Sequence, residues 1–331
     1  MKTTNKMLRI IILLLPVIFI FSCQSKNKVK PGTTNQTDTA KVFTYTFDIQ
    51  KEISAESAGR IAAEIMDAGN LKLMVNDQKI AYYSSPDDAS VYFEQDLNTG
   101  NLSFSKSMRK YYGKAVPKLP TADEADKLAR EYLKKFNLLP AKEEELKLVH
   151  KGGLRASSVI DGKKGGPVVD KMVTLTYGRF IDGVPVIGPG SKMLVNIGNE
   201  GEITGAIKRW REINMSSKTQ AKPEEVFTQK EAETELQKLM ATEFGREATY
   251  EVKSSSKAYY DGNGKTLQPV FVFETKVSLG KENVAPFDYL AIVNVLKNPA
   301  ESVRPIIDER AIRNVKAAKD IKPTRPLDKE D

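Results

Sequence analysis

Apolar residues repeat with the period of an α-helix in three segments of the chain. The first segment follows Ser54, and its apolar positions are Ala58, Ile61, Ala62, Ile65 and Met66. The other two follow Thr121 and Thr228, and each of these threonines has a glutamate three residues later. A Ser or Thr hydroxyl accepts a hydrogen bond from the first helical turn, and the glutamate returns one in a capping box. The pattern therefore predicts three helices, each beginning directly after its cap.

Short segments of alternating apolar and polar residues follow each predicted helix. The strand-like segments are 42–49, 71–75, 79–83, 90–96, 101–107, 145–150, three strands within 171–210, 248–253, 256–261, 267–277 and 288–296. Turn-forming residues separate them, among them Asp182-Gly183, 198–201 and 261–264. Strands that follow one another through tight turns pair antiparallel. The order predicts an antiparallel meander after each helix.

Thr121 and Thr228 both start a T-x-x-E-A sequence, and Ser54 starts a weaker copy, which indicates an internal repeat. We therefore predict an α+β fold of tandem units, each with one helix packed on a four-stranded antiparallel meander. The predicted units are 42–115, 116–215 with an insertion at 151–170 that forms a mobile loop, and 216–296. A charged, largely disordered tail is predicted for 297–331.

The N-terminus is typical of an exported protein. Lys2, Lys6 and Arg9 precede an apolar run at 10–21, which is shorter than the roughly 20 residues that a membrane-spanning helix needs. Ile20-Phe21-Ser22-Cys23 resembles the lipobox of bacterial lipoproteins, although Phe21 stands where a smaller residue is usual. The resemblance implies a signal peptide at 1–22 and lipidation of Cys23. A plain signal peptide or an uncleaved anchor is the alternative.

The composition is consistent with an exported protein. The chain is 40% hydrophobic and 28% charged, as in ordinary globular proteins, and Cys23 is its only cysteine, so no disulfide is expected. Residues 23–41 are polar and predict a flexible tether to the membrane. We expect a lipid-anchored protein of the bacterial cell envelope, more readily in the outer than in the inner membrane. An exported protein has no nucleic acid to bind, so none is expected as a partner despite the net charge of +8.

Three stretches resemble PepSY and related propeptide domains. They are FIDGVPVIG at 180–188 with the strand and glycine that follow it to 203, YFEQDLNTGNL at 92–102, and LQPVFVF at 267–273. The family implies a PepSY/cystatin-like fold and a noncatalytic role, which is to bind or restrain a peptidase or to organise an envelope complex. The sequence departs from the family pattern at the 151–170 insertion and in the missing D-x-x-T-G ending of the third unit.

No residue pattern commits the chain to a reaction. His150 is its single histidine, and it has neither a nucleophile motif nor a metal-binding partner near it in the sequence. We therefore expect no catalytic residue, no metal and no cofactor, with an unrecognised hydrolase as a remote alternative.

Two basic segments are candidate contact sites. The first is Lys208-Arg209-Trp210-Arg211, where strand alternation places Arg209 and Arg211 on one face and Lys208 and Trp210 on the other. A competing interpretation has Trp210 covering the core. The second is the predicted loop at 151–170, with Lys163 and Lys164.

Together these features predict a noncatalytic envelope lipoprotein that acts by protein binding. It would inhibit or regulate a secreted or membrane peptidase or an envelope complex. The alternative is an envelope protein that binds a glycan or a lipid on its concave sheet face or on the 151–170 loop.

Overall fold

The computed structural model describes residues 41–303 except 70, 114, 158, 161–162, 165–166 and 281–283. Three α-helices lie in this part of the chain. They are α1 (Ala55–Ile65), α2 (Ala122–Lys135) and α3 (Gln229–Phe244). The predicted caps are confirmed: Ser54 accepts a hydrogen bond from the amide of Ser57, and both Thr–Glu capping boxes are present.

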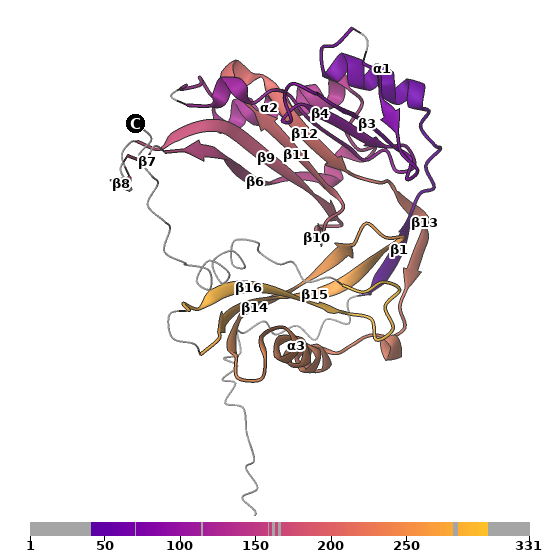
Figure 1. The fold of residues 1–331 in the computed structure, drawn as a ribbon. Coiled ribbons are helices and arrows are strands. Elements are labelled where there is room, and N and C mark those ends of the chain that lie inside the picture. The colour runs from indigo at the N-terminus through magenta and orange to yellow at the C-terminus, as the bar shows by residue number, and fades with distance from the viewer. Residues whose placement is uncertain are drawn as a thin grey trace, which may run out of the picture.

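The described strands form one large mixed sheet of 14 strands and a separate two-stranded hairpin. Eight of the 14 strands make up what we call the N-terminal region of the sheet. In spatial order they are β2 (Met74–Val75), β3 (Ile80–Ser84), β4 (Tyr92–Asp96), β5 (Leu102–Ser105), β12 (Ile203–Arg209), β11 (Lys192–Ile197), β9 (Val169–Ile181) and β6 (Leu146–Ala156). Helices α1 and α2 cover one face of this region (Figure 1).

The C-terminal region of the sheet is smaller and carries α3. Its strands are β14 (Thr249–Asp261), β15 (Thr266–Ser278) and β16 (Phe287–Asn294). Strand β10 (Val184–Ile187) joins the two regions, because it pairs antiparallel with β9 and parallel with β14. Strands β1 (Phe43–Phe47) and β13 (Ile213–Gln220) pair with each other, and β1 also pairs with β15. In Figure 1, α1 and α2 lie above the sheet and α3 below it, so the helix-free faces of the two regions are turned toward each other.

The predicted fold of tandem helix-plus-meander units is contradicted. Strands β5 and β12 pair through Ser105 and Gly205, so the first two predicted units share one sheet and one core. The third has three strands, not four, because 248–253 and 256–261 form the single strand β14. A separate meander would leave unpaired N–H and C=O groups along its edges, and pairing between units satisfies them.

The stretch 151–170 also differs from its prediction as a mobile loop. Strand β6 continues to Ala156 and β9 begins at Val169, and the register brings Arg155 opposite Asp170. The Nε of Arg155 lies 2.7 Å from Oδ1 of Asp170. Between these strands lies the hairpin of β7 (Val159–Ile160) and β8 (Lys163–Lys164). Strand β6 is exposed along most of its length, so its polar residues and glycines lack the apolar alternation that predicts a strand.

Several predictions fall on residues outside the described part of the chain. These are the signal peptide at 1–22, the lipidation of Cys23, nearly all of the tether at 23–41, and the tail beyond Val303. The start of the tail is described, and the Glu301 carboxylate accepts hydrogen bonds from the amides of Lys265 and Thr266.

Candidate binding hollow on the helix-free face

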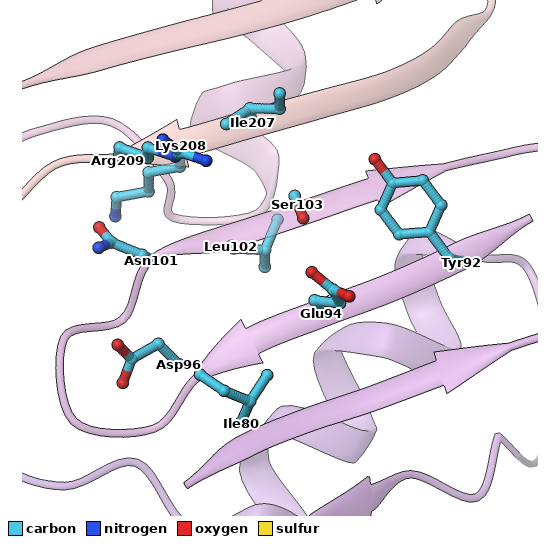
Figure 2. Close-up of a pocket in the computed structure, with 10 residues that line it drawn as sticks. All are labelled: Ile80, Tyr92, Glu94, Asp96, Asn101, Leu102, Ser103, Ile207, Lys208 and Arg209. Atoms are coloured by element: carbon cyan, nitrogen blue, oxygen red, sulfur yellow. The ribbon is translucent and has the colours of Figure 1, made fainter. Parts of the chain in front are cut away.

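Strand alternation gives the N-terminal region a polar face opposite its helices. On β4 and β5, Phe93 and Phe104 enter the core beneath α1 and α2, while their neighbours Glu94 and Ser103 point to the other side. A hollow of about 560 Å³ lies on this helix-free face. Its lining residues are Ile80, Tyr92, Glu94, Asp96, Asn101, Leu102, Ser103, Ile207, Lys208 and Arg209. Figure 2 shows the hollow with the helices behind the strands.

The hollow carries opposite charges on two different strands. Glu94 and Asp96 come from β4, whereas Lys208 and Arg209 come from β12. Strand β5 lies between them, since Glu94 pairs with Ser103 and Ser103 pairs with Ile207. Neighbouring strands are about 4.8 Å apart, so the acidic and basic strands are separated by roughly 10 Å. The hollow therefore has an acidic end and a basic end.

The four residues of the predicted basic surface, 208–211, lie in different surroundings. Arg209 is exposed at the basic end of the hollow, and Lys208 also lines the hollow. Burial lowers the pKa of the Lys208 amine. Trp210 is 2% exposed and belongs to the core, as the competing interpretation held. Arg211 turns away to the C-terminal region of the sheet, so the four side chains do not form one contact surface.

Arg211 belongs to a buried polar network that links the two regions of the sheet. Its Nη2 donates to Oδ1 of Asp261 at 2.9 Å, and the hydroxyl of Ser191 donates to Oδ2 of the same carboxylate at 2.7 Å. Arg179 donates to Ser191 Oγ at 3.2 Å and to the carbonyl of Arg211 at 2.9 Å. Its Nε lies 3.1 Å from a carboxylate oxygen of Glu145. Because β9 and the segment that follows β12 are thus tied to the end of β14, we assign the network a structural role.

The network also explains Trp210 and the glycine-rich turn before Ser191. The guanidinium of Arg179 stacks 3.9 Å from the centre of the Trp210 ring. A Cβ at Gly190 would overlap the carboxylate of Asp261, so only glycine fits there. Burial lowers the pKa of Arg179 and raises that of Glu145, and the attraction between them opposes both shifts.

The network does not have the form of a hydrolase site. Ser191 donates directly to a carboxylate and is 1% exposed, and the single histidine of the chain, His150, lies on β6 outside these contacts. Nucleophilic catalysis by serine needs a base that accepts its proton and access for the substrate. Residues 41–303, where described, also contain no group of three or more His, Cys, Asp or Glu side chains arranged to hold a metal ion. Within the same part of the chain, no helix has the length and apolar character to cross a membrane.

The second predicted site, the loop with Lys163 and Lys164, is only partly described. The backbone of both residues belongs to β8, which pairs with β7.

Sequence reasoning missed the acidic side of the hollow. Alternation in SVYFEQD already placed Tyr92, Glu94 and Asp96 on one face of a strand, but nothing local indicated that β12 would lie two strands away. It also missed the role of Asp261, which was interpreted as the first residue of a hairpin turn.

Comparison with known proteins assigns no family. No protein-family model matches the chain, and no curated protein matches it. Among solved structures, an uncharacterized protein from Eubacterium rectale ATCC 33656 is similar, with a TM-score of 0.44 and 10% sequence identity. The match covers 80% of this chain and 86% of that one. The resemblance to PepSY domains thus rests on the sequence motifs.

Proposed function

We propose that this protein is a noncatalytic lipoprotein of the bacterial envelope that binds a segment of another protein in the hollow on its helix-free face. The hollow is the observation that carries the proposal. It is open, lies on a sheet face, and combines an aromatic ring, two isoleucines and charges of both signs. Sites for small cofactors are usually enclosed and mostly apolar, whereas protein contact surfaces mix apolar and charged groups.

The polar network elsewhere supports a binding role over a catalytic one. Asp261, Ser191 and Arg179 are the most deeply buried polar groups near the junction of the two regions, and each has partners within the protein. Their hydrogen bonds are thus used to join the regions of the sheet. The guanidinium of Arg209, by contrast, is exposed in the hollow and available to a partner.

The lipid anchor is the second part of the proposal. Cys23 follows a basic start and a short apolar run, and the polar tether after it has a root-mean-square reach of roughly 25 Å. The partner is thus expected close to the membrane, and the PepSY resemblance favours a peptidase or an envelope complex. Replacing Cys23 with Ala tests the anchor. We expect release from membranes or an unprocessed precursor, and unchanged attachment with normal processing would overturn it.

The binding role is tested by chemical cross-linking and affinity recovery from whole envelopes. Ser103 lies in the middle of the hollow, so Ser103→Phe should fill it and abolish recovery of the partner. Lys127 lies exposed on α2, on the opposite side of the sheet, and Lys127→Phe is the matched control. Equal recovery with both variants would contradict binding in the hollow.

A glycan is the second candidate ligand, and one observation favours it. Tyr92 and Glu94 point to the same side of β4, and Asp96 and Asn101 line the other end of the hollow (Figure 2). The hollow thus offers a ring for stacking and carboxylate and amide groups for hydrogen bonds to sugar hydroxyls. A thermal-shift screen with soluble envelope glycan fragments distinguishes the two candidates. A glycan that binds only the folded state raises Tm, and Tyr92→Ala should remove that increase.

A further inference from the structure

Two cations occupy directly opposite positions on β11 and β12. The register pairs Lys192 with Arg209. The next residue on β11, Met193, enters the core, so Lys192 and its partner Arg209 point to the opposite, helix-free face. Like charges at opposite positions of an antiparallel pair destabilise a sheet. Lys147 extends the same row, since Lys147 and Lys192 both pair with Gly178.

These cations lack the counterions that other cations of the protein have. Arg179 and Arg211 each form an ion pair, with Glu145 and Asp261. In the described part of the chain, Lys147, Lys192 and Arg209 form no ion pair within 4 Å. Their side chains also form no hydrogen bond with another described residue.

The charge of Lys192 is also destabilised by loss of water, because the side chain is half-buried. Burial lowers the pKa of its amine, repulsion from Arg209 lowers it further, and Asp261 opposes the shift from across the junction. The Asp261 carboxylate is already engaged by Arg211 and Ser191. An anion placed between Lys192 and Arg209 would offset both the repulsion and the loss of water.

We infer that Lys192 and Arg209 bind an acidic side chain of an extended partner segment, and that a basic side chain of the same segment lies against Glu94 and Asp96. The inference rests on the proposed function and names the chemistry of the segment that it binds. The acidic end of the hollow favours a polypeptide over a polyanion as the ligand. A polyanion would meet Glu94 and Asp96 on β4, whereas a polypeptide with both charges matches both ends.

Strand spacing sets the distance between the two charges of the partner. Asp96 on β4 and Arg209 on β12 are two strands apart, which is roughly 10 Å. An extended chain advances about 3.3 Å per residue and returns to the same face every second residue. Side chains two or four positions apart are thus about 7 or 13 Å apart. The long arginine, lysine and glutamate side chains span the difference, so we expect a basic residue two or four positions from an acidic one.

The test measures binding of synthetic peptides to the full-length protein in detergent. The probes are labelled eight-residue Ser/Thr peptides with one Glu and one Lys two, three or four positions apart, and matched peptides with two Glu or two Lys. Inorganic polyphosphate is the polyanion probe. We expect the Glu/Lys peptides with a spacing of two or four to bind best and the spacing of three to bind less well, and we expect Lys192→Gln and Arg209→Gln each to weaken binding of the best peptide about tenfold. Lys127→Gln on α2 is the control that leaves it unchanged.

Stability gives a readout that a purely structural role would not produce. Arg209→Glu places a carboxylate opposite Lys192 and should raise Tm by about 1–3 °C while abolishing peptide binding. A lower Tm together with lost binding would mean that Arg209 supports the fold, and would overturn the inference.

The other outcomes also decide. Peptide binding by both Gln variants that is as tight as that of the unsubstituted protein, no binding of any Glu/Lys peptide, or tighter binding of polyphosphate overturns the inference. If Ser103→Phe abolishes partner recovery from envelopes but Lys192→Gln leaves it unchanged, the inference fails while the proposed function stands. If Ser103→Phe has no effect on recovery, the proposed function itself fails.

Discussion

The buried carboxylate of Asp261 offers the sharpest test of how the two regions of the sheet are joined. It is 1% exposed and accepts hydrogen bonds from Arg211, Ser191 and the amide of Asn263. The substitution Asp261→Asn keeps the shape of the side chain but removes its charge. Arg211 then stays nearly buried, with 12% of its side chain exposed and no anion in contact.

The expected loss of stability is large. Removing one partner of a buried ion pair costs about 3–5 kcal/mol, because the other charge is left uncompensated. For a protein of this size, 1 kcal/mol corresponds to about 2–4 °C in Tm, so Asp261→Asn should lower Tm by roughly 6–20 °C. The neighbouring Arg179 adds to the effect, since its hydrogen bond to Ser191 belongs to the same network.

Urea unfolding followed by tryptophan fluorescence measures this loss directly. Trp210 is the only tryptophan and lies under Arg179, so its emission reports on the network itself. Far-UV circular dichroism follows the rest of the sheet in parallel. The control is Asp288→Asn, which removes a carboxylate of an exposed ion pair with Lys253 and should leave the midpoint unchanged. Midpoints of Asp261→Asn and the control that agree within error would refute the role of the network.

Two further predictions concern a glycine and a partly buried carboxylate. Gly190→Ala places a methyl group against the Asp261 carboxylate and should cost about 1–3 kcal/mol in urea unfolding, whereas Gly59→Ala, in open space on α1, should stabilise by about 0.5–1 kcal/mol; the same sign at both sites would contradict the packing argument. Hydrogen bonds, the strongest from Ser107, lower the pKa of Asp88 to about 2, which is below its ordinary value of 3.8. Its contribution to stability should therefore be complete above about pH 4 and be lost as the pH falls toward 2, and an NMR titration that places its pKa near 4 would disprove this.

The helices were predictable because their signals are local. Ser54, Thr121 and Thr228 cap helices through bonds to residues three positions away, so a short window of sequence contains the whole interaction. The turns at Asp182-Gly183 and at 261–264 were predictable for the same reason. Asp182 and Gly183 both have positive φ, as a tight hairpin turn between twisted strands requires.

The pairing of strands was not predictable in this way. The contact between β5 and β12 joins residues about 100 positions apart, and the parallel pair of β10 with β14 joins residues about 70 apart. Every edge strand offers the same backbone groups, so the sequence of one strand does not name its partner. The fold was therefore assigned as separate units, although most of its elements were placed well.

The same limit applies to the residues of the site. Alternation correctly placed Trp210 on the face opposite Arg209, and Trp210 lies in the core. Alternation also placed Arg211 on the face of Arg209, and this prediction was wrong. Strand β12 ends at Arg209, and Arg211 reaches Asp261 on another region of the sheet. Charges brought together by long-range pairing, such as Glu94 and Arg209, become visible only in the fold.

The most direct test of the central claim, that the hollow binds a protein, is site-specific photo-cross-linking in bacterial cells that express the full chain. A photoreactive phenylalanine analogue is placed at position 103, within the hollow, or at position 127, on the outer side of α2. If the hollow binds a protein, position 103 should yield a discrete cross-linked protein and position 127 should not, and Arg209→Glu should remove the product. Equal products from both positions, or none from position 103, would contradict the account.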